Sequence, residues 1–240
     1  MFRIPELKRR ILFTAGILII YRLGSHIPTP GVDSNALRAF FENQAGGLFG
    51  LYDMFAGGNF SKATIFALGI MPYISASIIL QLLQAVVPYF ERLAKEGEEG
   101  RKKITQYTRY GTVALAMIQA VGISIFLESQ PGLVYQGGLL FKLVTVTTLV
   151  TGTVFVMWLG EQITERGIGN GISLIIFAGI VARLPIAVGN TFRLIRTGEL
   201  GVILIIGIIV LMVAAIAFIV FVEAAHRRIP VQYAKRIVGR

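Results

Sequence analysis

The residue types that could perform chemistry are few in this chain and widely separated. The two histidines, His26 and His226, stand near opposite ends, and cysteine is absent, so thiol catalysis, disulfides and thiolate metal sites are excluded. No H-E-x-x-H sequence occurs, and no pair of aspartates lies within an apolar stretch to form an aspartyl dyad. The sequence therefore predicts that the protein is not an enzyme, and it indicates neither a metal nor another cofactor.

Three glycines, Gly167, Gly169 and Gly171, superficially resemble a nucleotide-binding loop. Two features argue against that interpretation, because no strand precedes the glycines and the third spacing of G-x-G-x-x-G is missing. A tight turn in which Asn170 caps the following helix explains the same residues. We therefore expect a capped turn here rather than a phosphate site.

Four polar side chains interrupt one of the apolar stretches of the chain. An amide left unpaired in hydrocarbon costs several kcal/mol, so these groups should face protein or water rather than lipid. They are Ser75, Ser77, Gln81 and Gln84.

Two pairs of isoleucines share the i, i+4 spacing that places both members on one helical face. The pairs are Ile74 with Ile78, and Ile172 with Ile176. Two helices that each present such a pair could form a hydrophobic constriction that closes a pore by dewetting. The same spacing is usual for isoleucines that face lipid or pack in a bundle, so the residues alone leave both interpretations open.

Six apolar stretches must position these residues, and each is about as long as a bilayer is thick. A helix needs about 20 apolar residues to cross about 30 Å of hydrocarbon. The stretches are continuous rather than alternating, which predicts helices and not a barrel. Hydrophobic residues make up 55% of the chain, charged residues 15%, and the mean hydropathy is +0.71, as in polytopic membrane proteins. The expected spans are Ile11–Pro28, Thr64–Val87, Thr108–Leu127, Leu139–Leu159, Gly171–Ala187 and Gly201–Val222.

Basic residues concentrate before the first span, between the second and third, and after the sixth. Anionic headgroups and positive-inside sorting explain this distribution and the net charge of +10 better than a nucleic acid does. Both ends of the chain are therefore expected in the cytoplasm. One loop disagrees, because residues 183–200 should lie outside but contain Arg183, Arg193 and Arg196.

The segment between the first two spans is unusually long for a loop in a compact bundle. It contains Leu48–Gly58, about ten mostly apolar residues flanked by glycine pairs, which is too short to span a bilayer. A short helix on glycine hinges could be a movable element inside a pore. An amphipathic helix lying on the outer membrane surface explains the residues as well.

Four stretches of the chain resemble the SecY family of protein-translocation channels in its bacterial form. They follow one another in the order and at the spacing of that family. They are IPTPGVD (Ile27–Asp33), GGNFSKATIFALGIMPYISASIILQLL (Gly57–Leu83), KEGEEGRKKITQYTRYGT (Lys95–Thr112) and WLGEQITERGIGNGISLIIFAGIVA (Trp158–Ala182).

The resemblance implies an all-α polytopic membrane fold of ten spans, arranged as a pseudo-symmetric clamshell around a pore. Six transmembrane helices and a short re-entrant plug helix would come from this chain. Residues 1–187 would be the five-helix half with the plug at about 52–64, residues 188–222 an outer loop and the sixth span, and residues 223–240 the start of a cytoplasmic loop. The chain is then expected to be a piece of a longer protein.

The resemblance also implies roles for individual residues. The pore ring would contain Ile74, Ile78, Ile172 and Ile176. One wall of a lateral gate would contain Ser75, Ser77, Gln81, Gln84 and Gln119. The plug would contain Tyr52, Asp53, Met54, Phe55, Ala56, Gly57, Gly58, Asn59 and Phe60. Docking of the ribosome, including ribosomal RNA, or of the SecA motor would use Arg227, Arg228, Lys235 and Arg236.

The implied function is that of the central pore subunit of the general protein-secretion translocon, in the bacterial inner membrane. It would pass unfolded polypeptides across the membrane and laterally into it. The expected partners are SecE, SecG, SecA, the ribosome, signal sequences, nascent chains and membrane lipids. A small-solute transporter or channel built on an inverted repeat is the alternative, which ionisable residues at mid-membrane depth elsewhere in the protein would favour.

Overall fold

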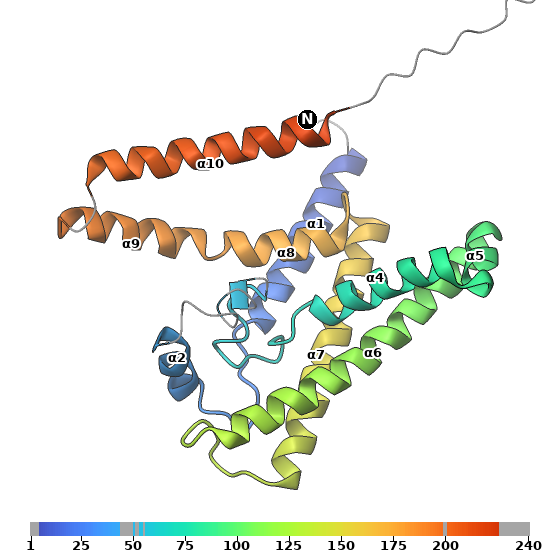
Figure 1. Ribbon diagram of the computed structural model, residues 1–240, viewed down its shortest axis with the longest axis horizontal. Helices are drawn as coiled ribbons and strands as arrows, with labels where there is room; N and C mark the ends of the chain where they lie inside the picture. Colours follow the sequence, from blue (N-terminus) through green and yellow to red (C-terminus); the bar gives the residue numbers. More distant parts are fainter. Residues whose placement is uncertain (1–4, 44–49, 51–52, 55, 199–200, 226–240) are drawn as a thin grey trace, which may run out of the picture. The chain divides into compact units, whose positions relative to one another are not determined.

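The computed structural model describes residues 5–43, 50, 53–54, 56–198 and 201–225, and the regular structure within these ranges is α-helical (Figure 1). The chain divides into two units, Met1–Pro185 and Ile186–Arg240. Helix α9 crosses this boundary, and α10 (Val202–Glu223) lies in the second unit. The helices before α10 are α1 (Pro5–Gly24), α2 (Ser34–Asn43), α4 (Met71–Val86), α5 (Pro88–Lys95), α6 (Glu98–Ser129), α7 (Leu139–Arg166), α8 (Gly171–Val181) and α9 (Leu184–Arg196).

Four helical stretches among the described residues are long and apolar enough to cross a membrane. Helices α4 and α5 meet the same criterion as a pair, although the chain bends by 98° between them, which makes up to five candidates. Helix α1 carries several charged residues in its first turns and Arg22 in its last, which lowers its hydropathy. The all-helical fold is confirmed, whereas the number of six spans stays a prediction. The four stretches are α6, α7, Gly171–Arg196 and Ile203–Glu223.

Helix α6 is the longest element of the first unit and packs against α4 and α7, while α7 also contacts α1 and α8 (Figure 1). Ala116 and Ala120 of α6 are completely buried, because small side chains let helices approach closely. Arg109 of α6 donates two hydrogen bonds of 2.8 Å to the carboxylate of Glu161 on α7. This bidentate pair fixes the two helices against each other near one end.

Residues 56–70, called the turn segment below, form a series of turns that leads into α4. The sequence predicted a helical span from Thr64, and that start is wrong because α4 begins at Met71. The backbone of this segment pairs elsewhere: Ile65 N–H donates to the carbonyl of Ile27 (3.0 Å). In the same way Thr29 N–H donates to the carbonyl of Ala63 (2.7 Å). These groups are consequently not free to form the first turns of a helix.

Local backbone conformation also places the start of α4. Gly69 has a φ of +57°, which interrupts a right-handed helix and favours glycine. Pro72 follows in the first turn of α4, where the missing N–H of proline has no helical partner to lose. Gly152 of α7 lies against the backbone carbonyl of Ile65 in the turn segment, and a Cβ at position 152 would overlap that carbonyl. The turn segment is thus held against α7 by a contact that only glycine permits.

Three further differences from the predicted elements come from helix ends and loops. Helix α1 ends at Gly24 rather than at Pro28. Helix α2 was not predicted, although Asp33 caps it by accepting hydrogen bonds from the N–H groups of Asn35 (2.9 Å) and Ala36 (3.1 Å). The expected fifth span, Gly171–Ala187, is interrupted after α8, and the stretch interpreted as an outer loop contains α9.

A hydrophobic cluster joins α1, the turn segment, α7 and α8, and it is called the α7 cluster below. Tyr21 of α1 stacks on Phe66 of the turn segment with ring centroids 5.8 Å apart. The cluster connects the turn segment with both ends of the first unit's sequence. Its buried members are Ile17, Tyr21, Phe66, Ile70, Val156, Met157, Leu159, Ile163 and Ile175.

Candidate functional site

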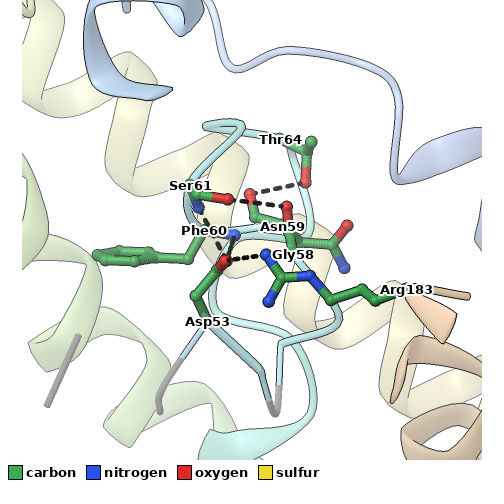
Figure 2. A network of polar contacts seen from close by, with 7 residues as sticks. All are labelled: Asp53, Gly58, Asn59, Phe60, Ser61, Thr64 and Arg183. Atoms are coloured by element: carbon green, nitrogen blue, oxygen red, sulfur yellow. Dashed lines mark hydrogen bonds and ion pairs between the residues drawn. The ribbon is translucent and has the colours of Figure 1, made fainter. Parts of the chain in front are cut away.

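Asp53 is the centre of a polar network in the region expected to be a plug (Figure 2). Its side chain is only 5% exposed, yet both carboxylate oxygens have partners. Oδ1 accepts hydrogen bonds from the N–H groups of Phe60 (3.1 Å) and Ser61 (2.9 Å), and Oδ2 forms an ion pair with Nη2 of Arg183 (2.9 Å). Burying an unpaired carboxylate would be very costly, so these three donors are what make the position tolerable.

The same network closes the turns that follow Asp53. Gly58 N–H donates to the backbone carbonyl of Asp53 (2.8 Å), and Thr64 N–H donates to the carbonyl of Asn59 (3.0 Å). The Asn59 amide in turn donates to the Tyr21 hydroxyl on α1 (3.1 Å). The turn segment is therefore bound to α1 through Asn59, and Asp53 connects it to Arg183, two residues after the end of α8.

A direct backbone contact joins the turn segment to α8. Gly57 has a φ of +69°, and a Cβ added there would lie 2.8 Å from the Cα of Gly179. Both residues must be small for the two backbones to approach so closely. The glycines at positions 57 and 179 thus allow the turn segment to pack against α8.

Positive charge exceeds negative charge around Asp53. Burial is the main cause that lowers the pKa of Lys62, and the nearby guanidinium groups of Arg22, Arg38 and Arg183 lower it further, while Asp53 acts in the opposite direction. The charge of Lys62 is therefore disfavoured by its surroundings. Of these cations, Arg183 forms an ion pair with Asp53.

Three of the four predicted pore-ring residues are partly buried against one hydrophobic cluster. Ile74 of α4 and Ile172 and Ile176 of α8 are half-buried and pack against the α7 cluster. Ile78, one turn further along α4, is 51% exposed and is not among the residues packed on that cluster. Three of these side chains thus border the same cluster, and their role as a ring stays a prediction.

The turn before α8 is capped as the sequence predicted. The side-chain oxygen of Asn170 accepts hydrogen bonds from the N–H groups of Ile172 (3.0 Å) and Ser173 (3.2 Å). Gly171 N–H donates to the Thr164 hydroxyl (2.9 Å). The interpretation as a helix cap rather than a phosphate loop is confirmed, and the cap fixes the helix that carries two of the ring candidates.

The predicted gate residues lie on α4 and α6, which pack against each other. Ser75, Ser77 and Gln84 are half-buried. Gln81 is exposed and donates to the Ser77 hydroxyl at 3.4 Å. The side-chain oxygen of Gln119 is buried without a hydrogen-bond partner among the described residues. A polar seam along these helices fits the prediction, which the structure does not test further.

Several predicted residues fall outside the described ranges. They are Tyr52 and Phe55 of the plug, and Arg227, Arg228, Lys235 and Arg236 of the docking tail. Five of the eleven residues of the expected helix Leu48–Gly58 also lie outside them, whereas Ala56–Phe60 form turns. Within the described part of the chain, no three His, Asp or Glu side chains converge to hold a metal ion.

The residue of this polar network that sequence reasoning did not connect with the plug region is Arg183. In the sequence it appears only as an exception to the positive-inside rule, because this arginine lies in a loop that was expected outside the membrane. The complementary signal was Asp53, an acidic residue within an apolar stretch that requires a partner when buried. Together the two anomalies point to an ion pair across 130 residues of sequence.

Comparison with known proteins gives a consistent result. A family model described as SecY matches residues 64–240. The protein translocase subunit SecY of Escherichia coli K12 is 56% identical over 238 residues, which cover 98% of this chain and 54% of that protein. The SecY of Pseudomonas aeruginosa is 54% identical over 237 residues, covering 99% of this chain and 53% of that protein. The chain spans about half the length of these curated relatives.

Solved structures with much lower sequence identity share the fold. Sec61 in the canine ribosome–channel complex from the endoplasmic reticulum matches with a TM-score of 0.63 at 18% identity, over 96% of this chain and 51% of that chain. A structure described as a protein conducting channel matches with a TM-score of 0.53 at 19% identity, over 76% of this chain and 38% of that chain.

Proposed function

The chain belongs to the SecY family, and we propose that it supplies one half of a channel that passes unfolded polypeptides across the bacterial inner membrane and laterally into it. In this proposal residues 1–187 form a five-helix half of a clamshell, and residues 188–222 add an outer loop region and a sixth span. The N-terminus and residues 223–240 lie in the cytoplasm. The opposite half comes from the rest of the assembled channel.

The observation that carries the proposal is that the helix with two ring candidates also contacts the plug candidate. Ile172 and Ile176 lie on α8, Gly179 of the same helix meets the backbone of Gly57, and Arg183 just beyond the helix pairs with Asp53. A constriction with a stopper seated beside it fits a closed pore. We therefore call residues 52–64 the plug from here on.

The mechanism follows from what such a channel must accept. A polypeptide in transit is extended and varied, so specific hydrogen bonds in the pore would trap some sequences. Branched apolar side chains form a deformable seal that excludes water and ions without binding the chain. Polar groups along α4 and α6 permit a separable seam, and an apolar signal segment leaves through it because lipid is its better solvent. The names of the relatives favour polypeptides over the small-solute alternative.

A crosslinking experiment tests the function. A photoreactive amino acid is placed at Ile74 or Ile172, in membranes where the assembled channel holds a stalled secretory precursor. It is expected to crosslink to that precursor. The same amino acid at Ile208, in the apolar middle of helix α10, is the control and should crosslink to lipid instead. Equal precursor crosslinking from all positions, or none from Ile74 and Ile172, would contradict the proposal.

The proposed partners are SecE, SecG, SecA, the ribosome, signal sequences and nascent chains, with the basic tail as the cytoplasmic docking element. Reversing the charges of Arg227 and Arg228 to Glu is expected to weaken ribosome binding and to make the remaining binding less sensitive to salt. The reason is that binding with fewer phosphate contacts releases fewer counterions. Reversal of Arg193 and Arg196 on α9 is the matched control. Binding that is unaffected by the tail variant would leave those arginines with a role in membrane orientation alone.

A further inference from the structure

Helix α8 and the two residues after it contact the ring candidates' cluster at one end and the plug at the other. Ile172 and Ile176 pack on the α7 cluster. Gly179 lies against the backbone of Gly57, and Arg183, two residues beyond the end of α8, binds Asp53 (Figure 2). No other described helix bears ring candidates together with an ion pair to the plug.

The two partners of the ion pair differ in their access to water. The Arg183 side chain is 45% exposed, whereas that of Asp53 is 5% exposed. Arg183 can therefore be rehydrated when it withdraws, but Asp53 would remain a buried carboxylate with two backbone donors and no counter-charge. The pair is thus stable while α8 stays in place, and its loss destabilises the seated plug rather than the helix.

Resting on the proposed function, we propose that Arg183 is a positioning residue that fastens the plug to α8. A displacement of α8 that widens the ring also withdraws Arg183 from Asp53 and Gly179 from Gly57. The plug then loses its counter-charge and its backbone contact in the same movement. One helix consequently couples the opening of the constriction to the release of the stopper.

These 240 residues contain no cysteine, so an engineered thiol is the one maleimide-reactive cysteine among them, and the channel without the engineered thiol gives the background. Ala56 is 1% exposed, and Ala56→Cys adds only a sulfur atom at a site that is covered while the plug is seated. The experiment uses membranes that contain the assembled channel and no precursor. The rate at which a water-soluble maleimide labels this thiol then measures the fraction of time that the plug is displaced. Met54→Cys, at a site that is 40% exposed, calibrates the access of the reagent.

Three variants in the Ala56→Cys background separate the ion pair from its surroundings. Asp53→Asn keeps a side-chain oxygen for the N–H groups of Phe60 and Ser61 but loses the charge, and Arg183→Gln loses the other charge. Each is expected to raise the labelling rate about tenfold, as loss of a hydrogen bond to a charged group predicts. Lys62→Gln removes a nearby cation that interacts with Asp53 only at long range, and it should leave the rate unchanged.

The double variant decides between a direct pair and two independent effects. If Arg183 acts through Asp53, the variant with both substitutions labels no faster than either single variant, and Arg183→Lys restores part of the protection. Effects that multiply, or a rate that Arg183→Gln does not change, would overturn the proposal. This readout needs no precursor, so it is independent of the crosslinking test. If the labelling rates contradict the role of Arg183 but Ile74 crosslinks to the precursor, the proposed channel function stands. If the labelling rates agree but no crosslink forms, the channel function fails and the ion pair stands.

Discussion

Replacing Gly57 with alanine is expected to unseat the plug and to make the resting channel leak ions. An alanine at a φ of +69° costs about 1–2 kcal/mol in backbone strain. Its Cβ would also lie 2.8 Å from Cα and 3.3 Å from the carbonyl carbon of Gly179, and backbone atoms of a packed helix cannot move aside as a flexible side chain can. Conductance of the assembled channel in a planar bilayer, without a precursor, measures the effect.

Gly132→Ala is the matched control for Gly57→Ala. Gly132 has a φ of +84°, so alanine meets comparable backbone strain there, but its Cβ would meet nothing within 4 Å. Gly179→Ala should fall between the two, because its Cβ would lie 3.2 Å from the Cα of Gly57. Equal leak from Gly57→Ala and Gly132→Ala would mean that the contact with α8 does not hold the plug.

Local chemistry explains the parts of this fold that could be predicted. Continuous apolar stretches fix helices α6, α7 and α10 because each stretch is long enough to satisfy its backbone internally. The cap at Asn170 was also predictable, since the side chain bonds only two and three residues ahead. Both signals are complete within a few turns of sequence.

The errors arise where a distant segment completes the structure. Residues 64–70 read as the start of a membrane helix because they are apolar, but their backbone pairs with the residues that follow α1. The sequence placed Asp53 in the plug and Arg183 in an exceptional loop without joining them, because their pairing depends on how α8 packs against the turn segment. A buried charge in sequence predicts that a partner exists, and only the tertiary structure says which one.

Replacing Ile78 with asparagine is expected to raise the ion conductance of the closed channel by about tenfold or more, because an amide in an apolar constriction keeps water in the pore. Ile78 is 51% exposed and is not among the residues that pack on the α7 cluster. Asparagine there should therefore leave the fold of this half intact. Ile74, Ile172 and Ile176 do pack on that cluster, so asparagine at those positions would mix a pore effect with a packing effect.

Leucine at the same position separates polarity from shape. Ile78→Leu keeps the volume and the apolar surface, so a ring closed by dewetting should stay closed, and only Ile78→Asn should leak. Both variants must accumulate in the membrane to the same level for the comparison to hold. If both leak equally, the seal depends on the fit of isoleucine rather than on the exclusion of water. If neither leaks, Ile78 faces lipid or the opposite half, and the constriction is formed by Ile74, Ile172 and Ile176 with residues from outside this chain.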